Sequence, residues 1–250
     1  MGDRPLAGQV ALITGAGRGI GRAIALAYAE AGAAVGCAAR TQSEIDEVAA
    51  AIHARGGQAL AIPVDVTDRT SVQQMTDSVI AEWGGLDILV INAGVNRDRR
   101  TVEESIPEEW LGTLDVNLNG AYYCAQAAIP HLKARGGGKI ITTGSGMGHR
   151  GSPERSAYCV SKAGLWMLTR CLAQELWPFN ISVNELVPGP VQTGMAPAPS
   201  KPGSDSSAGP SAQSEWQKRP EDVVPLALFL ATQPLVGPTA QSFNLMRREG

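Results

Sequence analysis

Short apolar runs alternate with helical stretches along nearly the whole 250-residue chain, and this alternation restricts the fold more than any other feature. The runs are rich in Val, Ile, Leu and Ala, as is typical of strands buried in a parallel sheet. Parallel strands need a crossover between them, usually a helix. The alternation therefore predicts an α/β protein with a doubly wound parallel sheet in a single domain over residues 1–250. We expect strands at 9–14, 34–39, 59–64, 86–91, 139–143, 181–187 and 242–246, and helices at 22–31, 41–55, 71–83, 107–135, 156–178 and 220–231.

Composition and charge exclude several classes of protein. With 44% hydrophobic and 18% charged residues, the chain suits one large folded domain rather than a disordered segment. The net charge is −3, and no basic run is interleaved with aromatic residues, so we expect no nucleic-acid partner.

Cysteine usage and hydropathy indicate the compartment. The four cysteines form no Cys-x-x-Cys pair and no Cys/His cluster with zinc-ligand spacing, so we expect no metal site and a reducing, cytoplasmic location. The first ten residues contain no apolar signal core. The uncharged stretch 223–246 is interrupted by Pro225, Pro234 and Pro238, which argues against a membrane span.

A glycine-rich loop, TGAGRGIG at 14–21, lies between the first predicted strand and the first predicted helix. Three of its four glycines, Gly15, Gly19 and Gly21, have the spacing G-x-x-x-G-x-G. Glycines in this context permit a tight turn and a close approach of the backbone to a pyrophosphate at the helix N-terminus. The loop therefore predicts a dinucleotide site, although an ordinary strand-to-helix turn has the same composition.

The end of the second predicted strand indicates which dinucleotide is bound. Folds that prefer NAD usually place Asp or Glu there to hold the ribose 2′-hydroxyl, and positions 37–40 contain no acid. Arg40 stands there instead, followed by Thr41, and an arginine can clamp a 2′-phosphate. Arg18 in the glycine loop adds a second positive charge. We therefore expect NADP(H); the alternative is that both arginines are solvated surface residues.

Other predicted strands also end in residues suited to a ligand. Asp65 and Val66 follow the third strand, where they would meet an adenine, and Asn92, Ala93 and Gly94 follow the fourth. Small residues at the carboxyl end of a strand let the backbone approach a ligand, where open α/β sheets bind.

Tyr158 and Lys162 lie one turn apart on one face of a predicted helix. A free phenol has a pKa of about 10, and a nearby ammonium lowers it, which would make Tyr158 a general acid or base. Ser145 precedes Tyr158 by thirteen residues, just after a strand, so its hydroxyl can hydrogen-bond to the group that Tyr158 protonates. Alone, this spacing also occurs in helices where the ring is half-buried and the lysine solvated.

Three further residues or segments carry expectations. Asn117 lies in the middle of a predicted helix, which is mildly unfavourable and indicates either a specific role or a solvated side chain. His149, in the loop after Ser145, is expected to make a local hydrogen bond rather than contact substrate. Residues 195–213, rich in Ala, Pro, Ser and Gly, are expected to form a mobile substrate flap, or else a surface insertion.

Taken together, the glycine loop, Asn92-Ala93-Gly94, Asn117, Ser145, Tyr158-x-x-x-Lys162 and Pro188-Gly189 resemble the short-chain dehydrogenase/reductase family over about residues 8–245. The resemblance implies a Rossmann-like sheet with strand order 3-2-1-4-5-6-7. It implies that Tyr158 is the general acid or base, that Lys162 lowers its pKa and binds the nicotinamide ribose, that Ser145 holds the substrate oxygen, and that Asn117 holds a water linking Lys162 to solvent.

The resemblance also implies contacts near the nicotinamide. Pro188, Gly189 and Val191 would pack beside the ring, and Thr193 would reach its carboxamide or phosphate side. With the residues argued above, the expected cofactor contacts are Gly15, Arg18, Gly19, Ile20, Gly21, Arg40, Thr41, Asp65, Val66, Asn92, Ala93, Gly94, Tyr158, Lys162, Pro188, Gly189, Val191 and Thr193.

The chain departs from the family pattern at three places. Ile91 replaces the first Asn of the usual Asn-Asn-Ala-Gly, Gly144 replaces the first Ser of the usual Ser-Ser, and the ending VGPTAQSFNLMRREG replaces a common Thr-Gly-Gln…Val-Asp-Gly-Gly. In relatives that ending often helps to build the tetramer, and the resemblance implies a homo-oligomer, a tetramer or a dimer.

The expected function is that of a carbonyl reductase, an oxidoreductase that transfers a hydride between NADP(H) and a small-molecule ketone or secondary alcohol. Two alternatives remain: an NAD-dependent alcohol dehydrogenase of the same family, and a non-catalytic dinucleotide sensor. A 3-oxoacyl thioester on an acidic carrier protein would favour a basic cleft mouth, for which the sequence offers Arg97, Arg99, Arg100 and Arg150.

Overall fold

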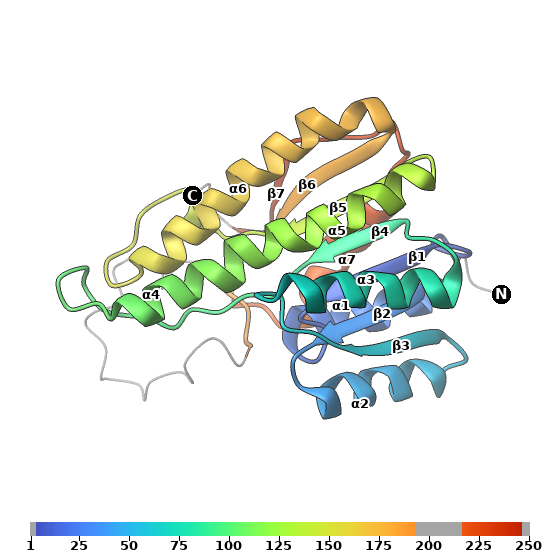
Figure 1. Ribbon diagram of the computed structural model, residues 1–250, viewed down its shortest axis with the longest axis horizontal. Coiled ribbons are helices and arrows are strands. Elements are labelled where there is room, and N and C mark those ends of the chain that lie inside the picture. The colour runs from blue at the N-terminus through green and yellow to red at the C-terminus, as the bar shows by residue number, and fades with distance from the viewer. Residues whose placement is uncertain (1–3, 194–216, 247–250) are drawn as a thin grey trace.

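The computed structural model describes residues 4–193 and 217–246. These residues contain a seven-stranded sheet in the order β3-β2-β1-β4-β5-β6-β7, and every neighbouring pair is parallel (Figure 1). The predicted fold class and strand order are confirmed. The strands are β1 (Val10–Thr14), β2 (Ala34–Ala39), β3 (Gln58–Pro63), β4 (Ile88–Ile91), β5 (Gly138–Thr143), β6 (Ile181–Val187) and β7 (Ser242–Asn244).

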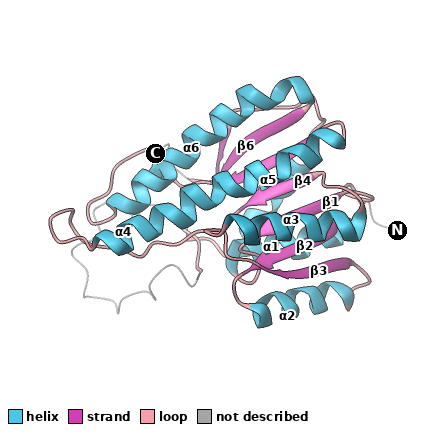
Figure 2. Cartoon of the chain, viewed as in Figure 1, coloured by secondary structure: helices cyan, strands magenta, loops and turns pink. Residues whose placement is uncertain are grey.

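Helices cover both faces of the sheet (Figure 2). One apolar layer packs under α3, α5 and α6, and the other packs under α1, α2 and α7. The helices are α1 (Gly19–Glu30), α2 (Gln42–His53), α3 (Arg69–Trp83), α4 (Pro107–Leu114), α5 (Gly120–Ala134), α6 (Ser156–Leu176) and α7 (Val224–Thr232).

The inner strands are buried on both faces, as the apolar runs predict. β1, β4 and β6 are buried at every position, whereas the edge strands β3 and β7 are partly exposed. Helices on both faces leave no polar side for an inner strand to present. Three polar side chains near carboxyl ends are nevertheless fully buried, Thr14 in β1, Thr142 in β5 and Glu185 in β6.

The predicted helix at 107–135 is interrupted. A π-helical turn, Asp115–Asn119, separates α4 from α5, and Asn117 lies at its centre with a buried side chain. Such turns occur mostly as single insertions in helices and frequently mark functional sites. The mid-helix asparagine was the sequence signal for this break, although the local pattern alone did not identify it as a π turn.

Other boundaries differ by a few residues. α1 begins at Gly19, inside the glycine loop, so that part of this loop forms the first turn of the helix. The last predicted helix begins with a 3-10 turn, Pro220–Val223, before α7. The expected flap at 195–213 lies outside the described residues. Within the described residues, no helix is long and apolar enough to cross a membrane.

Candidate active site

Asn92 connects three strands at the carboxyl edge of the sheet. Its side-chain Nδ2 donates to the backbone carbonyls of Thr14 at 3.0 Å and of Gly15 at 3.3 Å. The Thr14 hydroxyl in turn accepts from the backbone N–H groups of Asn92 at 3.0 Å and Ala93 at 3.1 Å. From β5, the Thr143 hydroxyl donates to Asn92 Oδ1 at 3.2 Å. This network holds the glycine loop, the end of β4 and the end of β5 in one arrangement.

The glycine loop forms a backbone cradle that side chains would fill. A Cβ on Gly21 would lie 2.2 Å from the carbonyl oxygen of Gly15, and Gly15 itself has a φ of +67°. The first turn of α1 begins here, with free N–H groups that attract an anion. Ile20 packs into the apolar layer beneath, which leaves the backbone of the turn at the surface. The cradle fits the predicted pyrophosphate.

The segment after β6 crosses the same edge and reaches the glycine loop. Gly189 has a φ of +69°, and a Cβ there would lie 3.0 Å from Met246 Cγ, so the chain turns sharply just after buried Pro188. Val191 then forms a parallel bridge with Lys218. Thr193 Cγ2 lies 3.1 Å from the position of a Cβ on Gly19, where φ is +57°. The predicted residues of the two loops therefore meet.

An acid that the sequence analysis missed lies beside the glycine loop. Arg18 Nη1 lies 3.8 Å from Glu44 Oε1, and a Cβ on Gly17 would lie 2.8 Å from both Cβ and Oε2 of Glu44. Arg40 and Thr41 lie exposed between β2 and α2. The sequence analysis found no acid at 37–40, but the first turn of α2 carries Glu44 back toward the loop. A carboxylate four residues past Arg40, at helical spacing, was the available signal.

Asp65 and Val66 follow β3 but are used locally. The Asp65 carboxylate accepts hydrogen bonds from the backbone N–H of Thr67 at 2.9 Å and its hydroxyl at 2.8 Å. The backbone bond, and further the charge of Arg40, hold the pKa of Asp65 below its ordinary value. The Val66 side chain is buried, 2.8 Å from the position of a Cβ on Gly120, and therefore packs against α5, so a contact with the cofactor, which stays a prediction, would come from its backbone.

Tyr158, Lys162 and Ser145 come together as the spacing predicts. Tyr158, in the first turn of α6, lies close enough to Ser145 for the serine side chain to lower the pKa of the phenol. Ser145 Oγ also accepts the backbone N–H of Met147 at 3.2 Å and so caps a 3-10 turn, Gly146–Gly148. Lys162, which is only 4% exposed, donates from Nζ to the carbonyl of Thr143 at 2.8 Å. Its Nζ lies 5.9 Å from the centre of the Tyr158 ring.

The electrostatics differ from the sequence expectation. Burial raises the pKa of Tyr158 above its ordinary value, and the side chain of Ser145 opposes that shift. Lys162 Nζ donates to the carbonyl of Thr143, and the lowering of the Tyr158 pKa by Lys162 stays a prediction. Burial also lowers the pKa of Lys162 to about 8, an effect that the charge of Glu185 partly offsets.

Asn117 fastens the loop after β4. Its Oδ1 accepts the backbone N–H of Val95 at 2.8 Å, and its Nδ2 donates to the carbonyl of Val95 at 2.9 Å and to Ser161 Oγ at 2.9 Å. A Cβ on Gly94 would lie 3.3 Å from Asn117 Oδ1 and 3.6 Å from Lys162 Nζ. The π turn therefore brings Asn117, Gly94 and Lys162 to one point beside the strand ends.

Two other expectations concern residues at the mouth of the site. His149 makes a hydrogen bond within the protein, but a long-range one rather than the local one expected, with its Nε2 3.0 Å from Glu185 Oε2. Arg100 is engaged by acids, with Nη1 at 3.2 Å from Asp98 Oδ1 and 2.8 Å from Glu109 Oε2. Its charge is thus largely compensated within the chain.

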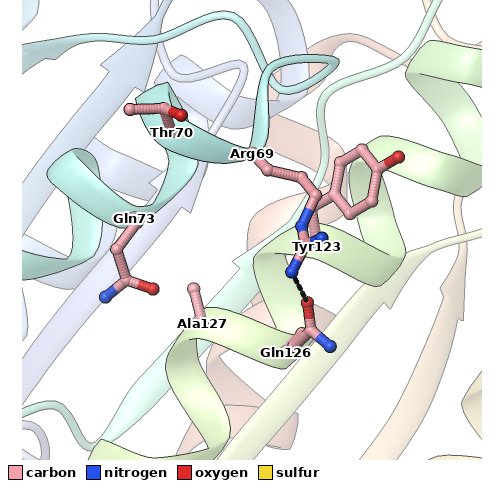
Figure 3. Close-up of a pocket in the computed structure, with 6 residues that line it drawn as sticks. All are labelled: Arg69, Thr70, Gln73, Tyr123, Gln126 and Ala127. Carbon is pink, nitrogen blue, oxygen red and sulfur yellow. Dashed lines mark hydrogen bonds between the residues drawn. The ribbon is translucent and has the colours of Figure 1, made fainter.

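A separate hollow lies between α3 and α5, on an outer face of the molecule (Figure 3). Arg69 Nη2 donates to Gln126 Oε1 at 3.2 Å across it, and the guanidinium lies 5.8 Å from the centre of the Tyr123 ring. None of the residues that line the hollow is a predicted site residue: Arg69, Thr70, Gln73, Tyr123, Gln126 and Ala127.

Comparison with known proteins gives a consistent set of similarities. A family model described as short chain dehydrogenase matches residues 9–202. A 3-oxoacyl-[acyl-carrier-protein] reductase from Synechocystis is 35% identical over 245 residues, covering 96% of this chain and 96% of that protein. A cis-4-hydroxycyclohexanecarboxylate dehydrogenase from Sinomonas cyclohexanicum is 36% identical, covering 90% of each.

Solved structures agree with the sequence comparisons. A short-chain type dehydrogenase/reductase from Mycobacterium marinum superposes with a TM-score of 0.84 at 37% identity, covering 97% of this chain and 95% of that chain. A 3-ketoacyl-ACP reductase from Sinorhizobium meliloti superposes with a TM-score of 0.85 at 35% identity, covering 94% and 96%.

Proposed function

The chain belongs to the short-chain dehydrogenase/reductase family, an oxidoreductase family acting on ketones and alcohols, and we propose that it transfers a hydride between NADP(H) and a ketone or secondary alcohol. The observation that carries the catalytic part is the convergence of Tyr158, Ser145 and the buried Lys162, where Ser145 acts on the Tyr158 hydroxyl and Lys162 Nζ lies 5.9 Å from the centre of its ring. A phenol, a hydroxyl and an ammonium at one strand edge suit proton transfer to a carbonyl oxygen.

Four side chains of the candidate site have separate roles in the proposed reaction. When bound, the nicotinamide supplies the hydride to the carbonyl carbon or accepts it in the reverse direction. Tyr158 holds the proton that the carbonyl oxygen receives, and Ser145 holds that oxygen by hydrogen bonding. Lys162 binds the nicotinamide ribose, which requires its Nζ to share or leave the carbonyl of Thr143. Asn117 holds a water that links Lys162 to solvent.

Arg40 supports NADP(H) as the cofactor, because its guanidinium stands exposed at the end of β2 with no acid at 37–40. Arg18 is the second cation in our proposal. One observation favours the alternative, NAD: Glu44 lies beside Arg18 and against Gly17, where it would repel a 2′-phosphate or accept a ribose hydroxyl. Substituting Arg40 and Glu44 one at a time therefore measures what each contributes to the choice between NADP(H) and NAD.

For the substrate, we propose a small ketone or secondary alcohol, with the 3-oxoacyl thioester as one candidate within that class. The Synechocystis relative is named as a reductase of 3-oxoacyl groups on acyl carrier protein. The Sinomonas relative is named as a dehydrogenase of a hydroxylated ring carboxylate. The ion pairs of Arg100 reduce its contribution to a basic surface for an acidic carrier, which leaves Arg97, Arg99 and Arg150 as the candidates for that contact.

We also propose a single catalytic domain that assembles as a homo-oligomer in the cytoplasm. Exposed apolar side chains on neighbouring helices support assembly: Leu111 is 55%, Tyr122 is 46% and Met167 is 49% exposed. The cysteines, all unpaired, support a reducing compartment. Light scattering at several concentrations measures the mass, and a monomer at every concentration would contradict the assembly.

The test of the cofactor is a titration of NADPH and NADH against the wild-type protein, Arg40→Asp and Glu44→Gln. Arg40→Asp should shift the preference from NADPH toward NADH. Glu44→Gln, which removes one nearby negative charge, should strengthen NADPH binding. An unchanged ratio in Arg40→Asp would reject NADP(H) selection by this residue, and tighter NADH binding in the wild type would favour the oxidising, NAD-dependent alternative.

The test of the chemistry is turnover on a panel of free ketones and a 3-oxoacyl thioester, with Tyr158→Phe as the matched variant. The variant loses only the hydroxyl, so it should bind NADPH normally and show no turnover. Retained turnover would remove Tyr158 from its role. Tight NADPH binding by a wild-type protein that turns over nothing on the panel would favour the sensor.

A further inference from the structure

A fully buried carboxylate lies beside the proposed catalytic residues and has no part in the reaction described above. Glu185, in β6, is 0% exposed. Its Oε2 accepts hydrogen bonds from Ser242 Oγ at 2.5 Å and is 3.0 Å from His149 Nε2. Its Oε1 is buried with no hydrogen-bond partner among the described residues. Burying a carboxylate is costly unless it is paired, so its retention at this position needs a reason.

The backbone next to Ser145 is shaped around this carboxylate. A Cβ on Gly144 would lie only 1.8 Å from Glu185 Oε1, closer than any two such atoms can approach. Gly144 is also anchored, since its N–H donates to the carbonyl of Leu186 at 2.8 Å. The carboxylate therefore occupies the space that a side chain at position 144 would need. The glycine at position 144, where the family usually has serine, therefore leaves the space that the buried carboxylate of Glu185 occupies.

His149 joins the carboxylate to the turn that carries Ser145. The 3-10 turn Gly146–Gly148 begins after Ser145 and ends at His149, whose N–H donates to the carbonyl of Gly146 at 3.2 Å. Within the turn, a Cβ on Gly148 would lie 2.7 Å from the backbone of Lys162, so the turn is pressed onto α6. The imidazole of His149 meets the Trp166 ring edge-on at 5.2 Å. The turn is thus held at its start, middle and end.

The arrangement is not that of a nucleophilic triad. Both Ser242 and His149 bind the same carboxylate oxygen, so the carboxylate lies between the hydroxyl and the imidazole. A histidine in that place cannot take the proton of Ser242, as a serine nucleophile would require. The contacts point to a support for neighbouring groups.

We propose that Glu185 is a positioning residue: its buried carboxylate, acting through His149, holds the Ser145 turn against α6 and keeps the Ser145 hydroxyl beside Tyr158. The proposal rests on the proposed function, in which Ser145 holds the substrate oxygen. A misplacement of about 1 Å at such a group can lower a rate by about a hundredfold. The described charged or titratable groups that act on this carboxylate are His149 and Lys162.

The test compares three variants by kcat, KM and NADPH dissociation constant. His149→Phe keeps an aromatic ring against Trp166 and removes the hydrogen bond, and Glu185→Gln keeps the shape and removes the charge. Each should lower kcat by about tenfold to a hundredfold with NADPH binding within about twofold of the wild type. Ser242→Ala, the matched control, removes a bond to the same oxygen without touching the turn and should leave kcat within about twofold.

Two readouts separate positioning from general loss of structure. The double variant of His149→Phe and Glu185→Gln should be no slower than the worse single variant, because both remove one contact. The alkaline limb of kcat/KM should move to lower pH in Glu185→Gln, because the carboxylate charge raises the pKa of Lys162. Any of three results would overturn the proposal. These are additive losses of kcat in the double variant, an alkaline limb that does not move in Glu185→Gln, and a loss of kcat in Ser242→Ala equal to that in His149→Phe.

A stability measurement covers the case in which Glu185→Gln folds poorly. Gly144→Ala should lower the melting temperature strongly in the wild-type background and much less in a Glu185→Ala background, where the space is free. Equal losses in both backgrounds would contradict the placement of the carboxylate and with it the proposal. If the wild type turns over a ketone and Tyr158→Phe does not, then unaffected His149→Phe kinetics would reject the positioning alone. No turnover by the wild type would reject both the proposed function and the positioning role of Glu185.

Discussion

Replacing Lys162 by methionine measures how much stability this chain loses by holding an ammonium group in its interior. Burial lowers the pKa of Lys162 from 10.5 to about 8. At about 1.36 kcal/mol per unit, that difference corresponds to about 3 kcal/mol of unfavourable charge burial near neutral pH. Methionine has a similar length and no charge. It leaves the carbonyl of Thr143 without its donor, which costs about 1–3 kcal/mol and offsets part of the gain.

The net expectation is that Lys162→Met is more stable than the wild type by about 1–2 kcal/mol at pH 7 and has no turnover. For a chain of this size, the melting temperature should rise by about 2–8 °C. Thermal unfolding of both proteins at one concentration, with a turnover assay on the same samples, measures the two effects together.

The pH dependence identifies the cause. Between pH 8 and 10.5 the folded Lys162 has lost its proton while the unfolded one keeps it, so the unfolded state binds more protons and stability rises with pH. The unfavourable contribution is complete below pH 8 and is gone above 10.5. The advantage of Lys162→Met should therefore be largest at pH 7 and small at pH 10. An advantage that is equal at both pH values, or a less stable variant at pH 7, would refute the reasoning.

Lys139 provides the matched control. It is also 4% exposed, burial also lowers its pKa to about 8, and it lies at the amino end of β5, away from Ser145. Lys139→Met should show a stability gain of the same sign and pH dependence, with turnover retained. Loss of turnover in this variant would show that the assay responds to general disturbance of the sheet.

Three further substitutions test other parts of the structure. Gly21→Ala places a Cβ 2.2 Å from the carbonyl of Gly15, so NADPH binding should weaken more than about tenfold in a fluorescence titration, and unchanged binding would contradict the cradle. Asn117→Ala leaves backbone groups of the loop after β4 unpaired, so thermal unfolding should show a loss of about 2 kcal/mol, and turnover should fall as well. Tyr28→Phe removes the 2.7 Å bond from its hydroxyl to the carbonyl of Ala227, between α1 and α7; the expected result is a loss of about 1 kcal/mol with unchanged kinetics, whereas altered kinetics would indicate a longer-range effect.

The order and type of the elements were readable in the sequence because they depend on local patterns. Apolar runs of strand length and intervening helical stretches predicted the seven strands, and the family resemblance implied their order in the sheet. Asn92, Ser145, Tyr158 and Lys162 were identified from their types and spacings, and the structure brings them to one edge of the sheet. Parallel strands put every carboxyl end at the same edge, so residues after different strands meet there.

The missed features all depend on contacts between distant segments. The π turn at Asn117 is stabilised by hydrogen bonds to Val95, 22 residues earlier, which no local pattern reveals. Glu44 reaches the glycine loop only because α2 folds back beside it. The flap at 195–213 lies outside the described residues, and its expected role stays a prediction.

The sequence by itself determined the alternation of strands and helices and the residue types of the candidate site, since hydrophobic periodicity and motif spacing are properties of neighbouring residues, and the family resemblance supplied the strand order. Only the tertiary structure decided the electrostatics of the site. Burial raises the pKa of Tyr158, and Lys162 turns to a backbone carbonyl. Glu185 meets His149 at a separation of 36 residues and fills the space above Gly144. Burial and charge pairing depend on which distant segments pack together, and that packing is set by the whole fold.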